Sequence, residues 1–171
     1  MKAAEIRNRP HAIDPDPYVE LDVQYATQWK PVPSPAQLRA WVRAAVASRR
    51  DRVSLTIRIV DEEEAFELNR RWRNVEKATN VLAFPCSGLE AIMPAFLGDV
   101  VLCAPVVARE AAVQHKGWGA HWAHLVIHGT LHLLGFDHAV PAQATEMEEV
   151  ERAVLQRLGY SDPYLLSTLQ K

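Results

Sequence analysis

The chain has 171 residues, of which 49% are hydrophobic and 23% charged, and its formal net charge at pH 7 is −2. This composition is typical of a folded globular protein. The near-neutral charge argues against a protein that coats nucleic acid through bulk positive charge, but leaves a local basic groove open. The apolar stretches are too short to span a membrane, no signal-peptide core begins the chain, and Cys86 and Cys103 are too far apart for a C-x-x-C site. We therefore expect a cytoplasmic protein with no membrane partner.

The first half of the chain begins with a proline-bearing lead-in, which we expect to be loosely ordered over residues 1–17. Apolar and polar residues then alternate over residues 19–25, ending at Tyr25, and this alternation predicts a half-buried strand. Ser34 and Pro35 are typical of the N-cap and first position of a helix. A second alternating strand is predicted over residues 52–60.

The second half begins with a helix predicted over residues 61–72. Asp61 is its expected N-cap, acidic residues fill its first turn and arginines its last, in agreement with the helix dipole. The remaining predicted elements are strands over 81–85 and 98–104 and helices over 105–116, 119–135 and 141–159.

These elements define one folded domain, which we expect to span residues 18–160, followed by a tail over residues 161–171. Strands and helices are mixed without strict β-α-β alternation. We therefore expect an α+β fold, in which a small mixed four-stranded sheet packs with about five helices.

The stretch HGTLHLLGFDH, residues 128–138, carries three histidines with the spacing of a metal site. His128 and His132 are four residues apart on a predicted helix, so their side chains lie one turn apart on the same face. Gly135 is typical of a helix end, and the chain that turns back there can bring His138 to the same ion. Three protein ligands with an open fourth position predict a catalytic zinc site.

The alternative for these histidines is simple packing in an apolar core. A lone histidine usually has that role, but three with this spacing and a helix-ending glycine rarely occur without a metal. His121 and His124 lie upstream on the same helix; for both, a packed or surface histidine is the favoured interpretation, although His124 could line the site. Asp137, beside His138, suits an acceptor that orients a ligand imidazole.

Gly129 stands where the related zinc-protease pattern, H-E-x-x-H-x-x-G-x-x-H, has its catalytic Glu. A peptidase needs that Glu to take a proton from water and pass it to the leaving amine. A phosphodiester instead needs its developing negative charge neutralised. Zinc alone lowers the pKa of its bound water to about 7, so hydroxide can form without a protein base. The missing Glu therefore favours phosphodiester cleavage over amide cleavage.

A cluster of cations at the end of the predicted helix 61–72 could bind phosphate. Arg73 lies where the helix gives way to loop, and a planar guanidinium there could clamp a phosphate while Trp72 stacks on a base. The alternative is that these cations only cap the helix and that the tryptophan is buried. We favour that alternative for Arg70 and Arg71, whereas the spacing leaves both interpretations open for Arg73.

These segments together resemble the YbeY family, bacterial rRNA maturation factors described as zinc-dependent, single-strand-specific endoribonucleases. HGTLHLLGFDH matches the family signature H-G-x-L-H-L-x-G-[YF]-D-H at every defined position, and HWAH before it fits as well. LNRRWRNVEKATNVLAFP and LGDVVLC resemble two further family segments, so the matches run in order from about residue 51 to residue 155. Asn80 and Ala83 depart from the family's usual Asp and Ser, which weakens any acid or base role for residue 80.

The resemblance implies that His128, His132 and His138 bind one zinc ion and that Arg73 contributes to activity, with Asp137 as a further candidate at the catalytic site. It also implies processing of ribosomal RNA, notably 3′-end maturation of 16S rRNA, and ribosome quality control. The implied partners are single-stranded RNA, the small ribosomal subunit and an Era-type GTPase.

Two other functions remain as alternatives. Another zinc hydrolase, such as a peptidase or a deaminase-like enzyme, is disfavoured by the missing Glu, because both rely on such a base. A ribosome-assembly factor whose zinc is structural is compatible with the weak overall charge. The open coordination position argues against it.

Overall fold

The structure, a computed structural model, describes residues 16–165 of the chain. Four strands in this range form one sheet in the order β1-β2-β4-β3, with β1 and β4 parallel to β2 and the edge strand β3 antiparallel to β4. The strands are β1 (Tyr18–Ala26), β2 (Arg52–Val60), β3 (Val81–Pro85) and β4 (Phe96–Cys103). The helices are α1 (Pro35–Val46), α2 (Glu62–Arg73), α3 (Ala104–Val113), α4 (Trp118–Leu133) and α5 (Pro141–Arg157).

This architecture confirms the predicted α+β class, with a mixed four-stranded sheet and five helices among the described residues. The predicted strand over 98–104 begins two residues earlier, at Phe96, and the predicted helix over 105–116 ends earlier, at Val113. Most of the predicted lead-in, residues 1–17, and part of the predicted tail, 161–171, lie outside the described residues. The proposed division into lead-in, domain and tail therefore stays a prediction.

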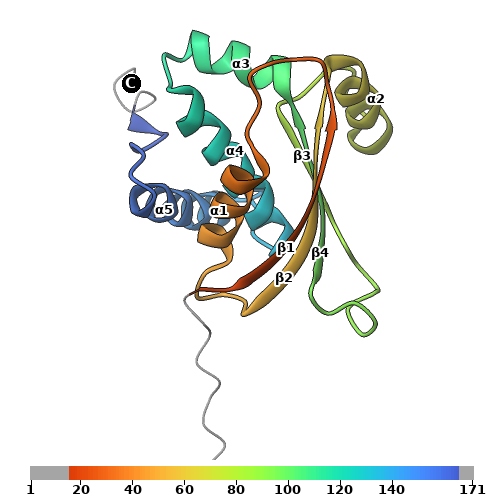
Figure 1. Cartoon of the computed structure of the whole chain (residues 1–171), viewed down its shortest axis with the longest axis vertical. Coiled ribbons are helices and arrows are strands. Elements are labelled where there is room, and N and C mark those ends of the chain that lie inside the picture. Colours follow the sequence, from red (N-terminus) through yellow and green to blue (C-terminus); the bar gives the residue numbers. More distant parts are fainter. Residues whose placement is uncertain (1–15, 166–171) are drawn as a thin grey trace, which may run out of the picture.

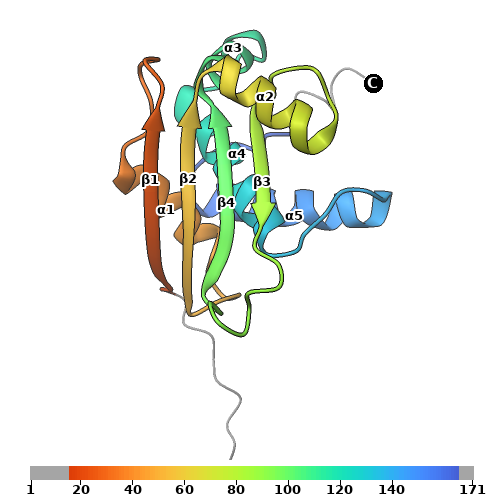
Figure 2. The same ribbon diagram turned by 90° about the vertical axis from the view of Figure 1, so that its right-hand side faces the viewer.

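The two faces of the sheet are covered unequally. Helices α1, α4 and α5 lie on one side of the sheet, and α2 lies alone on the other (Figure 1). The view turned by 90° shows β3 as the edge strand, beside α4 and α2 (Figure 2). Helix α4 packs against α1 and α5 and also against β3 and β4, so it is the central helix of the larger layer.

Local sequence explains why α1 begins where it does. The Ser34 hydroxyl accepts a hydrogen bond from the backbone N–H of Gln37, whose side chain in turn accepts one from the N–H of Ser34. This reciprocal pair is a capping box, and Pro35 occupies the first helical position as predicted. The helix then buries an apolar stripe that includes Leu38 and Trp41.

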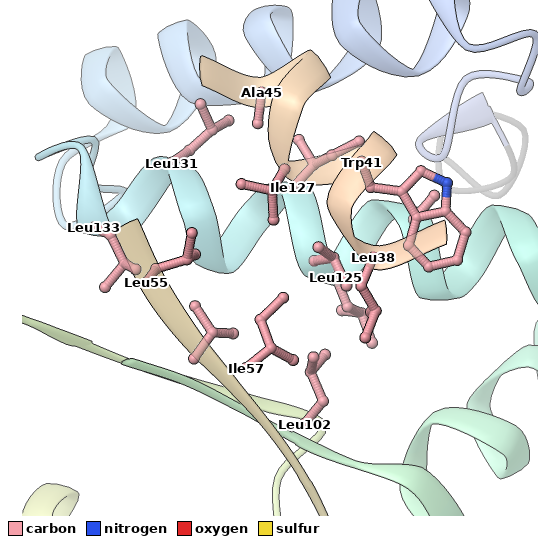
Figure 3. Packing of buried hydrophobic residues seen from close by; sticks show 14 of the residues in the cluster. Leu38, Trp41, Ala45, Leu55, Ile57, Leu102, Leu125, Ile127, Leu131 and Leu133 are labelled. Atoms are coloured by element: carbon pink, nitrogen blue, oxygen red, sulfur yellow. The ribbon is translucent and has the colours of Figure 1, made fainter. Parts of the chain in front are cut away.

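The main hydrophobic core lies between the sheet and the α1/α4 layer (Figure 3). Leu55 and Ile57 of β2 face Ile127 and Leu131 of α4, and all four side chains are at most 2% exposed. Each fully buried aliphatic side chain contributes roughly 1.5–3 kcal/mol relative to an exposed one. The core therefore holds α4 firmly, and with it the helix end that carries two of the predicted metal ligands.

Two local predictions differ from the structure. Asp61 occupies the N-cap position of α2 but makes no side-chain cap hydrogen bond, because its carboxylate accepts the Thr27 hydroxyl instead. Tyr25, at the end of the alternating strand, is 42% exposed, and its hydroxyl donates to the carbonyl of Pro33 at 2.7 Å.

No helix among the described residues has the length and apolar character needed to cross a bilayer. Cys86 and Cys103 are both free thiols, in agreement with the prediction that they form no disulfide framework.

Candidate metal centre

Three histidines converge at the C-terminal end of α4 and the loop that follows. His128 and His132 project from successive turns of the helix, with their Nε2 atoms 3.1 Å apart. The helix ends at Leu133, and Gly135 takes a φ of 99°, a conformation that favours glycine, as the chain turns back. His138 then lies against both rings, with centroid separations of 5.6 Å to His128 and 4.9 Å to His132.

This geometry fits a single metal ion. Nitrogen ligands at about 2.0–2.1 Å from a tetrahedral zinc lie roughly 3.3–3.4 Å from one another. The 3.1 Å between the Nε2 atoms of His128 and His132 is close to that value, and one ring nitrogen from each of the three histidines lies within 4.8 Å of the others. Modest side-chain rotation would bring all three to one ion, so the residues present suit zinc or another divalent metal that accepts imidazole.

His132 is held neutral, as a ligand must be. Burial lowers the pKa of His132, and the neighbouring His128 and His138 lower it further, to about 4. At neutral pH its ring therefore carries no extra proton, and a lone pair is available for a metal.

Glu151 of α5 is the functional residue that the sequence interpretation missed. Its side chain is fully buried, and its Oε1 lies 2.5 Å from Nδ1 of His128. Burial alone raises the pKa of this carboxyl, but the hydrogen bonds from His124 and His128 outweigh burial and lower the pKa to about 2. A signal was present in the sequence, because Glu151 interrupts the apolar stripe that α5 forms with Met147, Val154 and Leu155.

Glu151 also links His124 to the site without making it a ligand of the same ion. Nε2 of His124 lies 3.0 Å from Oε2 of Glu151. His124, His128 and Glu151 form a second group with metal-like spacing. The 2.5 Å between Glu151 and His128 is, however, shorter than the roughly 3.3 Å that separates two ligands of one zinc ion, and it is a hydrogen-bond distance.

Gly129 is explained by packing. A Cβ at this position would lie 2.7 Å from Cγ1 and 3.3 Å from Cγ2 of Val100, and 3.3 Å from Cγ2 of Val81. Both valines belong to strands, β4 and β3, so α4 lies close against the sheet at position 129. The Glu of the protease pattern therefore has no room at this position.

A cleft of about 330 Å³ opens beside the histidines on the side of α2 and β3. Arg73, the last residue of α2, lines this cleft together with His132 and His138. One of its guanidinium nitrogens, Nη2, donates to the carbonyl of Ala83 on the exposed edge of β3, at 3.2 Å. The structure thus brings Arg73 to the same cleft as two of the predicted ligands, as an anion clamp requires.

Asp137 lines the same cleft, but its observed hydrogen bond is local. Its Oδ1 accepts from the backbone N–H of His138 at 2.7 Å. The contact with an imidazole nitrogen that we expected of Asp137 is made in this structure by Glu151 on His128. A catalytic role for Asp137 stays a prediction.

The other residues considered in the sequence lie away from the cleft. Trp72 is 60% exposed and packs edge-on against Phe84, at 6.2 Å, rather than being buried. His121 is buried, and its Nε2 lies 2.9 Å from a carboxylate oxygen of Glu110. Both oxygens of Glu110 also accept from the side-chain amide of Asn80. Asn80 therefore serves as a hydrogen-bond donor, where an Asp would set a second carboxylate against Glu110.

Comparisons with known proteins identify relatives of this chain. A family model described as Endoribonuclease YbeY matches residues 24–159. The Endoribonuclease YbeY of Stutzerimonas stutzeri is 52% identical over 147 residues, which are 85% of this chain and 91% of that protein. The proteins of the same name from Pseudomonas syringae pv. tomato and Pseudomonas fluorescens are 50% and 52% identical over 85% of this chain, covering 88% and 96% of their own lengths.

A solved structure shares the fold. The solution structure of TM1509 from Thermotoga maritima matches with a TM-score of 0.53 and 22% identity, covering 82% of this chain and 97% of that one. At this identity the likeness shows the fold alone. The family match is stronger, because it spans residues 24–159, most of the chain, and the named relatives are about half identical to it. The chain therefore belongs to the YbeY endoribonuclease family.

Proposed function

We propose that the chain is a zinc-dependent endoribonuclease that cleaves single-stranded RNA in the cytoplasm and acts in rRNA processing and ribosome quality control. The observation that carries this proposal is one cleft lined by a cation, Arg73, and by two of three clustered histidines, His132 and His138. The names of the relatives support RNA as the substrate.

The three histidines would hold the ion through neutral ring nitrogens. Once bound, zinc would lower the pKa of a coordinated water to about 7 and polarise a phosphoryl oxygen. His132 offers its lone pair at neutral pH because its pKa is lowered to about 4. With only three protein ligands, such an ion would keep a further position for water or substrate.

Arg73 would bind the scissile phosphate. A guanidinium has five N–H donors in a planar fork, and the observed bond to the carbonyl of Ala83 occupies only one of them. That bond fixes the guanidinium at the cleft edge, so the remaining donors can meet the phosphoryl oxygens as negative charge develops. Positioning and charge neutralisation are what phosphodiester cleavage requires of the protein.

The packing of Gly129 supports an RNA substrate over a peptide. Amide cleavage in the zinc-protease pattern uses a Glu that takes a proton from water and then passes it to the leaving amine, and position 129 has no space for that side chain. We further propose, from family resemblance, that 3′-end maturation of 16S rRNA is the role, with the small ribosomal subunit and an Era-type GTPase as partners.

The test is a substrate panel with zinc-loaded, metal-quantified protein. A labelled single-stranded RNA, the same RNA paired with its complement, and a mixed peptide library are incubated under identical conditions. Cleavage of the single strand alone is the expected result. Peptide cleavage would instead identify a protease, and full zinc occupancy with no cleavage of any substrate would favour an assembly factor with a structural metal.

A further inference from the structure

A buried carboxylate with three donors stands behind the metal centre. Glu151 is fully buried, and both of its oxygens are used. Oε1 meets Nδ1 of His128, while Oε2 meets Nε2 of His124 and accepts the hydroxyl of Tyr164. Burying a carboxylate is unfavourable unless such donors surround it, and an apolar residue at this position of α5 would pack without that cost.

The hydrogen bond to His128 sets the state of that ring. A neutral imidazole carries one proton, and the carboxylate draws it to Nδ1. Nε2 of His128 then presents a lone pair in the direction of His132, whose Nε2 lies 3.1 Å away. The bond also restricts rotation of the ring, because Glu151 is itself held by two further donors.

Glu151 acts from outside the substrate cleft. His128 and His138, but not Arg73, line a separate small cavity of about 90 Å³ together with Glu151 and Tyr164. The cleft that contains Arg73 lies beside His132 and His138. Glu151 does not line the cleft with Arg73, and the member of the histidine cluster that it contacts is His128.

The C-terminal segment closes this network. Tyr164 follows α5, and its ring lies edge-on to His124 at 5.4 Å while the guanidinium of Arg152 lies 4.9 Å from its centroid. Asp162 accepts the backbone N–H of Tyr164 at 2.8 Å and pairs with Arg152 at 3.2 Å. Contacts to the ring and to the backbone of Tyr164 thereby hold its hydroxyl against Glu151.

We propose that Glu151 and Tyr164 are positioning residues of the metal centre: Glu151 fixes the tautomer and orientation of His128, and Tyr164 fixes Glu151. This inference rests on the proposed metal site and adds to it a residue of α5 and a residue of the segment that the sequence assigned to a tail. Acceptors behind a metal-binding histidine typically contribute 10–100-fold to metal affinity.

The test is zinc affinity, measured by competition with a chromophoric chelator, for the full chain and three variants. Glu151→Gln keeps the shape but removes the charge, and Tyr164→Phe removes only the hydroxyl. Glu149→Gln is the matched control, because Glu149 lies on the same helix, is exposed, and neutralises the same charge. Visible absorption of the cobalt-substituted proteins reports ligand geometry independently of activity.

We expect Glu151→Gln to lose about 10–100-fold in zinc affinity and to change the cobalt spectrum, as acceptors behind ligand histidines do. Tyr164→Phe should lose affinity by a smaller factor, and Glu149→Gln should match the wild type. If Glu151→Gln is folded, as judged by circular dichroism, and binds zinc as the wild type does, the positioning role is overturned. If Glu151→Gln does not fold, an unchanged affinity in Tyr164→Phe overturns the network. A wild-type chain that binds no zinc overturns the proposed function itself.

Discussion

Replacing Gly129 with alanine tests whether packing explains the missing catalytic Glu. Alanine is favoured over glycine in a helix by about 1 kcal/mol, so propensity alone predicts stabilisation. The added Cβ would lie 2.7 Å from a methyl group of Val100, which is fully buried and whose branched side chain has little rotational freedom. Overpacking of this kind costs about 1–3 kcal/mol. Set against the propensity gain, this leaves a net loss of up to about 2 kcal/mol, which lowers the melting temperature by up to about 8 °C in a domain of this size.

Gly119 provides the matched control on the same helix. A Cβ at Gly119 would approach no closer than 3.5 Å, to the hydroxyl of Tyr160, which is ordinary contact. Gly119→Ala should therefore keep or raise the melting temperature. Thermal unfolding of the metal-free proteins, followed by circular dichroism, gives both values.

A second substitution shows whether Val100 is the cause. Val100→Ala alone should cost about 2–3 kcal/mol, because it removes buried methyl groups and leaves a cavity. In the double variant the Cβ at position 129 fills part of that space, so the double variant should be more stable than the sum of the two single losses by about 1–2 kcal/mol. Strict additivity, or stabilisation by Gly129→Ala alone, would refute the packing explanation.

Two further predictions concern Arg73 and pH. The Arg73→Ala variant should keep its zinc, as measured by elemental analysis. Its RNA cleavage rate should fall about 10²–10³-fold, because a charge-stabilising donor is removed. Arg70 pairs with Glu67 at the surface, so Arg70→Ala is the control and should retain the wild-type rate. Wild-type cleavage by Arg73→Ala would remove the anion clamp from the mechanism. Because the folded pKa of His132 is about 4 and that of an unfolded histidine about 6.5, the unfolded state binds more protons between these values. The metal-free protein should therefore lose roughly 1–2 kcal/mol of unfolding free energy as pH falls from 6.5 to 4, a value reduced for partial solvent exposure of the ring. Urea denaturation at several pH values measures this loss. No loss in this window, or a gain, would contradict the lowered pKa of His132.

The histidine cluster could be predicted from sequence because its geometry is local. His128 and His132 share a helix face through a four-residue spacing, and Gly135 marks the turn that returns His138. Such relations depend only on helix geometry and glycine conformation. The strands and helices were predicted for the same reason, because hydrophobic periodicity identifies them without knowledge of their partners.

The apolar stripe of α5 marks Glu151 as unusual, but its contacts could not be predicted because its partners are distant in the chain. Glu151 meets His128 across 23 residues, and the sequence interpretation gave the role of imidazole acceptor to Asp137 because it is adjacent to His138. The structure instead places the backbone N–H of His138 on Asp137. The reason for Gly129 was equally hidden, since it depends on how closely α4 approaches Val100 and Val81 of the sheet.

The central claim is that the histidine cluster holds a metal that makes the chain an RNA-cleaving enzyme. The most direct measurement is cleavage of a labelled single-stranded RNA by metal-quantified wild type and His132→Ala, before chelation, after chelation and after zinc is restored. We expect cleavage by the wild type to stop on chelation and return with zinc, and the His132→Ala variant to lose both metal and cleavage. Cleavage that survives chelation, or that His132→Ala retains, would contradict this claim.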